Sequence, residues 1–253
     1  MSSGTRAAAQ RPANRLEAAG SLETVFAPVR SHTAFEEAVD RLGTAIRLGL
    51  LPPGIRLPPE RDLCEKLGIA RSTLRQALVA LGQSGHLRAL RGRGGGTFVA
   101  DPLPPAAPPS PAVLSAWRDI SDRRSALEIG VAVLAAQRSD PAAVDPLDDL
   151  VWALDALLDD FPAYRQADVR LHVGLAEATG SPRLVSAMTE AQGEMTGLIS
   201  LIAHPPEVLA SSNAQHRVVL HAVRAGQEMR AARAMAEHVQ GTEHILAGLL
   251  PQA

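Results

Sequence analysis

The sequence predicts a mainly α-helical chain in which a small N-terminal domain precedes a larger, all-helical C-terminal domain. Three observations support this fold class. The chain has 253 residues, of which 46% are hydrophobic, enough for a core in each of two domains. Aromatic residues make up only 3%, which is typical of helices packed through aliphatic side chains rather than of a large sheet. A proline-rich stretch at 101–111 separates the two parts.

The spacing of apolar residues and the positions of proline and glycine predict the elements of the N-terminal half. Residues 1–30 are rich in Ala, Ser, Gly and Arg without sustained periodicity, which indicates a flexible N-terminal arm. Over 33–48, apolar residues recur at intervals of three and four, as in an amphipathic helix, and LPPG at 51–54 ends it. A second helix is predicted over 58–67, with prolines and an acid in its first turn.

A third helix is predicted over 71–83, after the short connection 68–70. Two helices joined in this way have the length and turn of a helix-turn-helix. Two β-like runs follow at 87–90 and 97–99, separated by RGRGGG, and they indicate a hairpin with a basic, glycine-rich tip. The order of these elements predicts a winged helix-turn-helix domain over 31–100.

The second half of the chain is predicted to be a helical bundle. DPLPPAAPPSP at 101–111 contains six prolines, which exclude a continuous helix or a central strand and indicate a stiff linker. Over 112–253, long helix-like segments are separated by X-Pro pairs and by Gly226. These breaks predict about six helices with short connections.

Charge is distributed unevenly along the chain. Basic minus acidic residues come to +2 for 1–30, +4 for 31–100 and −8 for 101–253, although the whole chain carries only −2. The asymmetry favours contact of the first hundred residues with a polyanion. The single cysteine, Cys64, excludes an internal disulfide, and no apolar run approaches the roughly 18 residues of a membrane helix. We therefore expect a cytoplasmic, nucleoid-associated protein.

The predicted helix over 71–83 carries a polar face suited to duplex DNA. Its apolar residues form one stripe, so the polar ones point the other way. Arg75 can donate two bonds to guanine, and Gln76 can read adenine. Arg91 and Arg93 flank glycines that permit close approach to phosphate or to the minor groove. The alternative is that Arg71, Arg75 and Gln76 form an ordinary helix face exposed to solvent, as most such groups of polar residues do.

The segment RLPPERDLCEKLGIARSTLRQALVALGQSGHLRALRGRGGGTFV closely resembles the DNA-binding domain of the GntR regulator family, and the resemblance covers 45–99. One departure is Ala70, where the family usually has Ser or Thr. The loss of such a helix cap is expected to cost about 1 kcal/mol of local stability. The resemblance implies operator contacts at Arg61, Arg71, Ser72, Thr73, Arg75, Gly94 and Gly95.

Four polar residues of the helical half have a spacing that suits a metal ion. Asp168 and His172 are four apart and share one helical face. His216 lies ten residues before Gly226 and His238 twelve after it, so a helical hairpin turning at Gly226 brings both to the same level. The alternative is that each histidine is an ordinary core or surface residue, which is how we interpret His32, His86, His204, His221 and His244.

The segments DVRLHVGLAEATG, HRVVLHAVRAGQ and ARAMAEHV resemble those that carry metal ligands in the FCD-type effector domain of the FadR subgroup. The resemblance implies a divalent metal, zinc or nickel first, with positions left for water or a ligand carboxylate. Residue types alone do not select the metal. Arg124 matches an arginine that faces the effector cavity in many relatives, a place where a guanidinium can clamp a carboxylate. A simple helix pair between Arg124 and Glu128 is the alternative.

These expectations combine into a homodimeric, ligand-responsive transcription repressor that binds palindromic operator DNA and is released by a small organic acid bound beside a divalent metal. Two alternatives remain. A metal-dependent hydrolase is compatible with an open metal position, although no separate base or nucleophile has convincing spacing. A metal-sensing regulator needs no organic ligand.

Overall fold

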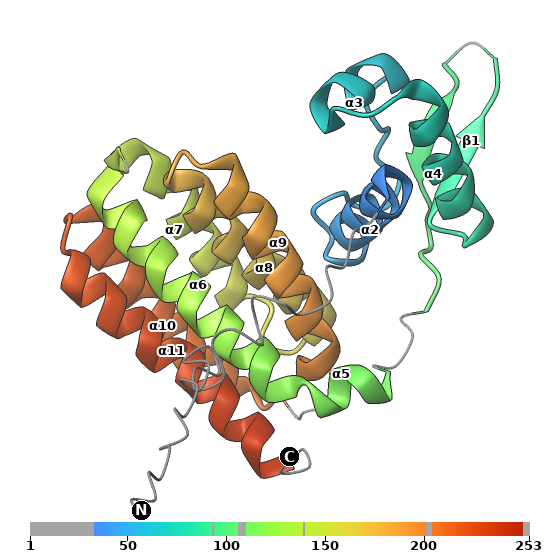
Figure 1. Cartoon of the computed structure of the whole chain (residues 1–253). Helices are drawn as coiled ribbons and strands as arrows, with labels where there is room; N and C mark the ends of the chain where they lie inside the picture. Colours follow the sequence, from blue (N-terminus) through green and yellow to red (C-terminus); the bar gives the residue numbers. More distant parts are fainter. Residues whose placement is uncertain (1–32, 93, 106–109, 139, 201–203, 250–253) are drawn as a thin grey trace, which may run out of the picture. The chain divides into compact units, whose positions relative to one another are not determined.

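The computed structural model describes residues 33–92, 94–105, 110–138, 140–200 and 204–249. The predicted N-terminal arm over 1–30 and Arg93 lie outside these described residues. Within the described ranges the chain forms ten helices and one two-stranded sheet, which confirms the predicted mainly α fold (Figure 1).

The winged part contains three helices and a hairpin, close to the predicted positions. The second helix ends at Gly68, whose φ of 64° is left-handed and whose backbone N–H donates to the Cys64 carbonyl. A glycine takes this conformation without steric cost. The third helix begins after Ala70, which makes no side-chain cap. The elements are α2 (Ala34–Arg47), α3 (Glu60–Leu67), α4 (Arg71–Gln83), β1 (Leu87–Leu90) and β2 (Gly96–Val99).

The hairpin is antiparallel and pairs Leu87 with Val99 and Leu90 with Gly96. A third extended segment, which the sequence did not indicate, forms an isolated bridge between Arg56 and Phe98. The segment runs beside β2, because the Leu57 N–H donates to the Thr97 carbonyl and the Ile55 carbonyl accepts from the Val99 N–H, both at 2.9 Å.

One apolar core holds the winged part together. The predicted stripe of α4 faces it: Leu74 and Ala77 are fully buried and Leu81 is 4% exposed. Burial of this stripe directs the opposite face of α4 to solvent. The cluster consists of Leu42, Ile46, Leu57, Leu63, Leu74, Leu81, Leu87 and Val99.

The second part is a helical bundle with seven described helices where about six were expected. The additional one is the short α5, which starts at Pro111 because Ser110 caps it, accepting from the Val113 N–H at 3.3 Å. Its first residue is the last of the predicted linker. The helices are α5 (Pro111–Ser115), α6 (Trp117–Arg138), α7 (Pro141–Asp155), α8 (Phe161–Ala178), α9 (Pro182–Ile199), α10 (Pro206–Arg224) and α11 (Glu228–Leu249).

The X-Pro pairs that interrupt the sequence pattern are helix starts. Asp140 and Asp160 accept hydrogen bonds from backbone N–H groups in the first turns of α7 and α8, at 3.0 and 3.1 Å. A proline in the first turn, Pro141 in α7 and Pro162 in α8, lacks only an N–H that would have had no backbone partner in the helix. Gly226, with φ 65°, turns the chain between α10 and α11, which pack together and against α6. Among the described helices, none has the length and apolar character to cross a membrane.

Candidate DNA-binding face and candidate metal centre

The outer face of α4 carries the predicted DNA-contacting side chains. Arg71, Ser72, Arg75 and Gln76 are exposed, while Thr73 is half-buried. The amphipathic pattern therefore predicted correctly which residues point to solvent. Their contact with DNA stays a prediction.

Glu60, at the start of α3, holds two of these arginines. Its Oε2 accepts from Arg75 Nε at 2.8 Å and from Arg71 Nε at 3.3 Å. The hydrogen bond from Arg75 lowers the pKa of Glu60 below its usual value. The two arginine side chains are still 68% and 59% exposed. Sequence reasoning missed Glu60 because it lies eleven residues or more from its partners.

The hairpin tip depends on glycine. Gly94 has φ 87°, which favours glycine. A Cβ placed on Gly95 would lie 2.4 Å from the Leu90 carbonyl oxygen, so a side chain there would force the turn to change. Arg91 is exposed beside these glycines, and Arg61, on α3, has a side chain that is 92% exposed.

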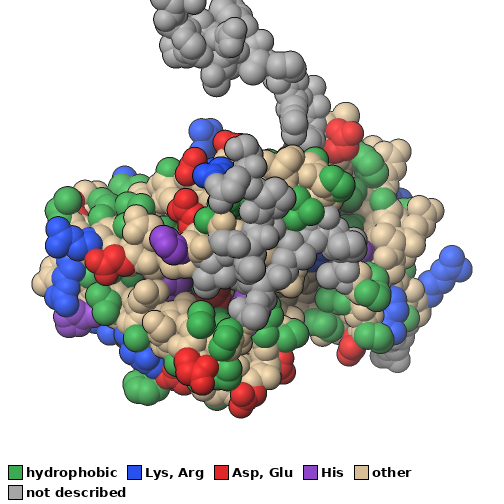
Figure 2. All heavy atoms as spheres, turned by 90° about the horizontal axis from the view of Figure 1, so that it is seen from below, with side chains coloured by type: hydrophobic (Ala, Val, Ile, Leu, Met, Phe, Trp, Pro, Cys, Tyr) green, Lys and Arg blue, Asp and Glu red, His purple; other side chains and the backbone are tan. Residues whose placement is uncertain are grey.

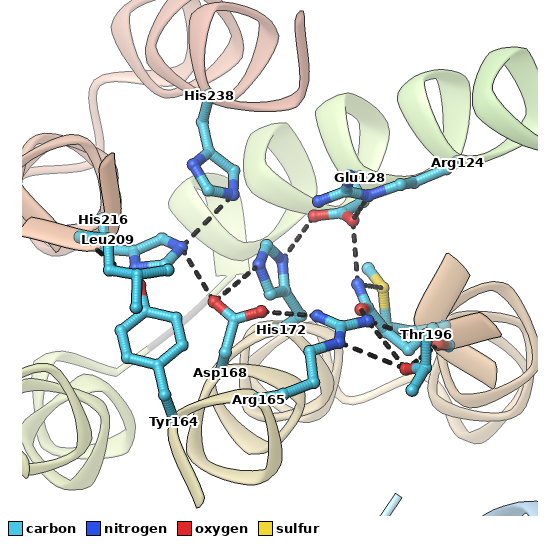
Figure 3. A network of polar contacts seen from close by, with 12 residues as sticks. Arg124, Glu128, Tyr164, Arg165, Asp168, His172, Thr196, Leu209, His216 and His238 are labelled. Atoms are coloured by element: carbon cyan, nitrogen blue, oxygen red, sulfur yellow. Dashed lines mark hydrogen bonds and ion pairs between the residues drawn. The ribbon is translucent and has the colours of Figure 1, made fainter. Parts of the chain in front are cut away.

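The four predicted metal ligands meet inside the helical bundle. Asp168 and His172 stand one turn apart on α8, His216 comes from α10 and His238 from α11. Their exposures are 7%, 0%, 1% and 5%. Figure 3 shows the three imidazole rings pointing toward one another, with the Asp168 carboxylate beside them. The structure thus brings the three histidines together, with the ligand atoms of all three within 4.8 Å of one another, and places Asp168 beside His172 and His216. Their role as metal ligands stays a prediction.

The converging atoms lie at distances that suit a single ion. Nε2 of His216 is 3.2 Å from Nε2 of His238, and Asp168 Oδ1 is 3.5 and 3.7 Å from Nε2 of His216 and of His172. Ligand atoms about 2.1 Å from zinc in a tetrahedral arrangement lie about 3.4 Å apart. His172 Nε2 is buried and has no hydrogen-bonding partner within the described residues. The three histidines could therefore hold a divalent metal, and the Asp168 carboxylate lies beside two of them.

The protonation of the cluster also suits a metal. Burial lowers the pKa of His216 to about 4 and that of His238 well below its usual value. Both rings are therefore neutral near pH 7 and offer lone pairs. Burial alone would raise the pKa of Asp168, but His172 and Arg165 hold it well below its usual value, so Asp168 is a carboxylate.

Two buried arginines stand next to the cluster. Arg165 donates to Asp168 Oδ2 at 2.5 Å and to Gln192 Oε1 at 2.8 Å, and burial lowers its pKa. Arg124 donates to Glu128 Oε1 at 2.6 Å, so the helix pair is present, with both side chains buried. Sequence reasoning missed Arg165, although its position three residues before Asp168 on one helix was a usable signal.

A cavity of about 320 Å³ adjoins the cluster. Arg124, Arg165, Asp168 and His238 line it, so one compartment presents cationic groups and two of the candidate ligands. His204, expected to be an ordinary core or surface residue, lines the cavity and stacks on Phe161 with ring centroids 3.5 Å apart. Apolar walls come from Phe161, Ile199, Val208 and Leu209.

One face of the molecule shows how charged side chains are distributed among the described residues. On the face that Figure 2 shows, basic and acidic side chains of the described residues are interspersed among hydrophobic ones, and neither sign covers a continuous area.

Comparison with known proteins agrees with this arrangement. Residues 34–99 match the model for bacterial regulatory proteins of the gntR family, and 119–241 match the FCD domain. RmpR of Mycobacterium gastri, named as an HTH-type transcriptional regulator, is 35% identical over 217 residues, covering 80% of this chain and 76% of its own length. The chain belongs to the GntR family. It is a DNA-binding transcription regulator of the GntR/FCD type.

A further relative and a solved structure are also similar to this chain. A protein of Escherichia coli (strain K12), named as an L-lactate dehydrogenase operon regulatory protein, is 32% identical over 81% of this chain and 83% of its own length. The solved structure of McbR/YncC from E. coli has the same fold, with TM-score 0.54, 19% identity, and coverage of 86% of this chain and 99% of that one. The matched families and relatives are regulators rather than enzymes, so the hydrolase alternative is set aside.

Proposed function

We propose that this GntR regulator is a homodimeric repressor whose operator binding is relieved by a small carboxylate held beside a divalent metal. The observation that carries the proposal is the shared compartment. Asp168 and His238 belong both to the candidate ligand cluster and to the cavity wall, and Arg124 lines the same space. An anion in the cavity would thus contact the metal site and a cationic side chain together.

The four candidate ligands are three histidines and one carboxylate, which suit zinc or nickel. A bound divalent ion would supply positive charge to a compartment in which Arg124 and Arg165 already pair with Glu128 and Asp168. The metal would then be the main source of positive charge that no carboxylate already balances, and so would attract an anionic effector. The two arginines would orient that effector. The name of the E. coli relative makes L-lactate the first compound to test.

On the DNA side, we propose that α4 enters the major groove and that Arg75 and Gln76 read base edges. Arg61, Arg71, Ser72 and Thr73 contact phosphates near the helix start. The hairpin tip, with Arg91, Arg93, Gly94 and Gly95, follows the backbone or the minor groove. Two copies related by a two-fold axis would address the two halves of a palindrome.

The test is a gel shift on the DNA that flanks the protein's own gene, with purified protein of known oligomeric state. Zn²⁺ or Ni²⁺ is added alone, and then with L-lactate and other small carboxylates. Release of the retarded band by metal plus a carboxylate is the expected result, and a switch from 99:1 to 1:99 occupancy requires about 5.5 kcal/mol of differential binding. Operator affinity that responds to metal alone favours the metal-sensing alternative. Binding that no added compound changes contradicts the effector proposal.

A further inference from the structure

Glu128 on α6 is a fully buried carboxylate whose two oxygens have different surroundings. Oε1 accepts from Arg124 Nε at 2.6 Å and from Gln192 Nε2 at 2.9 Å. Oε2 lies 2.5 Å from Nδ1 of His172 (Figure 3). The carboxylate thus stands between two donors on one side and a candidate metal ligand on the other.

Glu128 Oε2 and His172 Nδ1 are both buried, and within the described residues neither makes a hydrogen bond to any other group. Their ion-pair contact at 2.5 Å is therefore the polar contact that each of these two atoms has. The other ring nitrogen, Nε2, is directed to the cluster, 3.7 Å from Asp168 Oδ1. A neutral imidazole carries one proton, so the nitrogen that holds it decides which nitrogen presents a lone pair.

We propose that Glu128 is a positioning residue that accepts the Nδ1 proton of His172 and so directs the Nε2 lone pair into the ligand cluster. The inference rests on the metal site proposed above. Histidine ligands in proteins commonly donate their second N–H to a carboxylate or carbonyl, which fixes the tautomer and the ring orientation. His238 has a related contact, with its Nδ1 3.2 Å from Gln215 Oε1.

The surroundings of Oε1 make this role testable by one isosteric change. In Glu128→Gln, only one of the two terminal atoms remains an acceptor, and two donors, from Arg124 and Gln192, face the Oε1 position. The carbonyl oxygen of the new amide therefore stays with them, and its NH₂ group faces His172. An NH₂ donor requires a lone pair on Nδ1, so the ring proton moves to Nε2, the nitrogen that a metal needs.

The experiment uses the full chain, labelled with ¹⁵N-histidine, freed of metal with a chelator and examined by NMR, followed by Zn²⁺ titration. In the unmodified protein we expect His172 to carry its proton on Nδ1, and in Glu128→Gln on Nε2. Zn²⁺ affinity should fall about 10- to 100-fold in the variant. Glu190→Gln is the matched control, because Glu190 also accepts from an arginine of α6, Arg123, but is exposed.

The unmodified protein alone provides a readout that does not depend on how the variant folds. A His172 proton on Nε2 in the metal-free chain overturns the inference, as does a variant with the original tautomer and unchanged Zn²⁺ affinity. An equal loss of affinity in Glu190→Gln counts against a specific role. If the unmodified chain binds no Zn²⁺ while the tautomers differ as expected, the metal proposal fails and the positioning of His172 by Glu128 stands.

Discussion

Replacing Arg75 by alanine should change the preference for operator DNA while leaving the unfolding free energy nearly unchanged. The Arg75 side chain is 59% exposed and makes its ion pair with Glu60 at the surface, so its loss should cost at most about 1 kcal/mol of unfolding free energy. A two-pronged contact to guanine contributes about 1–3 kcal/mol of discrimination. Arg75→Ala should therefore weaken preference for the operator about 5- to 150-fold while the domain stays folded.

The assay is fluorescence anisotropy with labelled operator and with unrelated duplex at fixed salt, together with urea denaturation. The operator preference should fall much more than affinity for unrelated DNA, since phosphate contacts do not carry sequence information. Arg230→Ala on α11, where the arginine donates to nearby Gln227, is the control and should change neither value. An unchanged operator preference in Arg75→Ala would refute the major-groove assignment of α4.

Three further predictions concern glycine and the metal. Gly174→Ala should lower the unfolding free energy by about 1–3 kcal/mol in urea denaturation, because its Cβ would lie 2.4 Å from Cδ2 of buried Leu147. Gly95→Ala should weaken binding to operator and unrelated DNA alike in the anisotropy assay, because relieving the clash with the Leu90 carbonyl alters the tip that approaches the backbone. Zn²⁺ at about 100 times its Kd should raise the unfolding free energy by about 2.7 kcal/mol, and His216→Ala should abolish the effect.

Each of these predictions has a result that would contradict it. Unchanged stability of Gly174→Ala would mean that the neighbouring leucine yields at little cost. Gly94→Ala carries only the strain of a positive φ, since its Cβ meets nothing within 4 Å, and it should lose less affinity than Gly95→Ala. His221→Ala, exposed on the helix that carries His216, should keep the Zn²⁺ stabilisation. Loss of that stabilisation in both histidine variants would argue against a defined site.

Local features of the sequence were sufficient for the elements and for much of the candidate site. The spacing of apolar residues sets which face of α4 is buried, and X-Pro pairs with a preceding cap set where helices begin. Asp168 and His172 share a face because a helix repeats every 3.6 residues. Gly226 turns the chain, which places His216 and His238 at one level on adjacent antiparallel helices.

The tertiary structure decided which residues surround these groups. Glu128 meets His172, Arg165 meets Gln192, and Arg56 bridges to Phe98 across distances in sequence that no periodicity relates. Such contacts depend on how helices and strands pack, since a small change in the crossing of two helices moves a side chain by more than a hydrogen-bond length. The sequence by itself therefore determined the elements and the candidate ligands, whereas packing alone determined the cavity and the groups that hold each ligand in place.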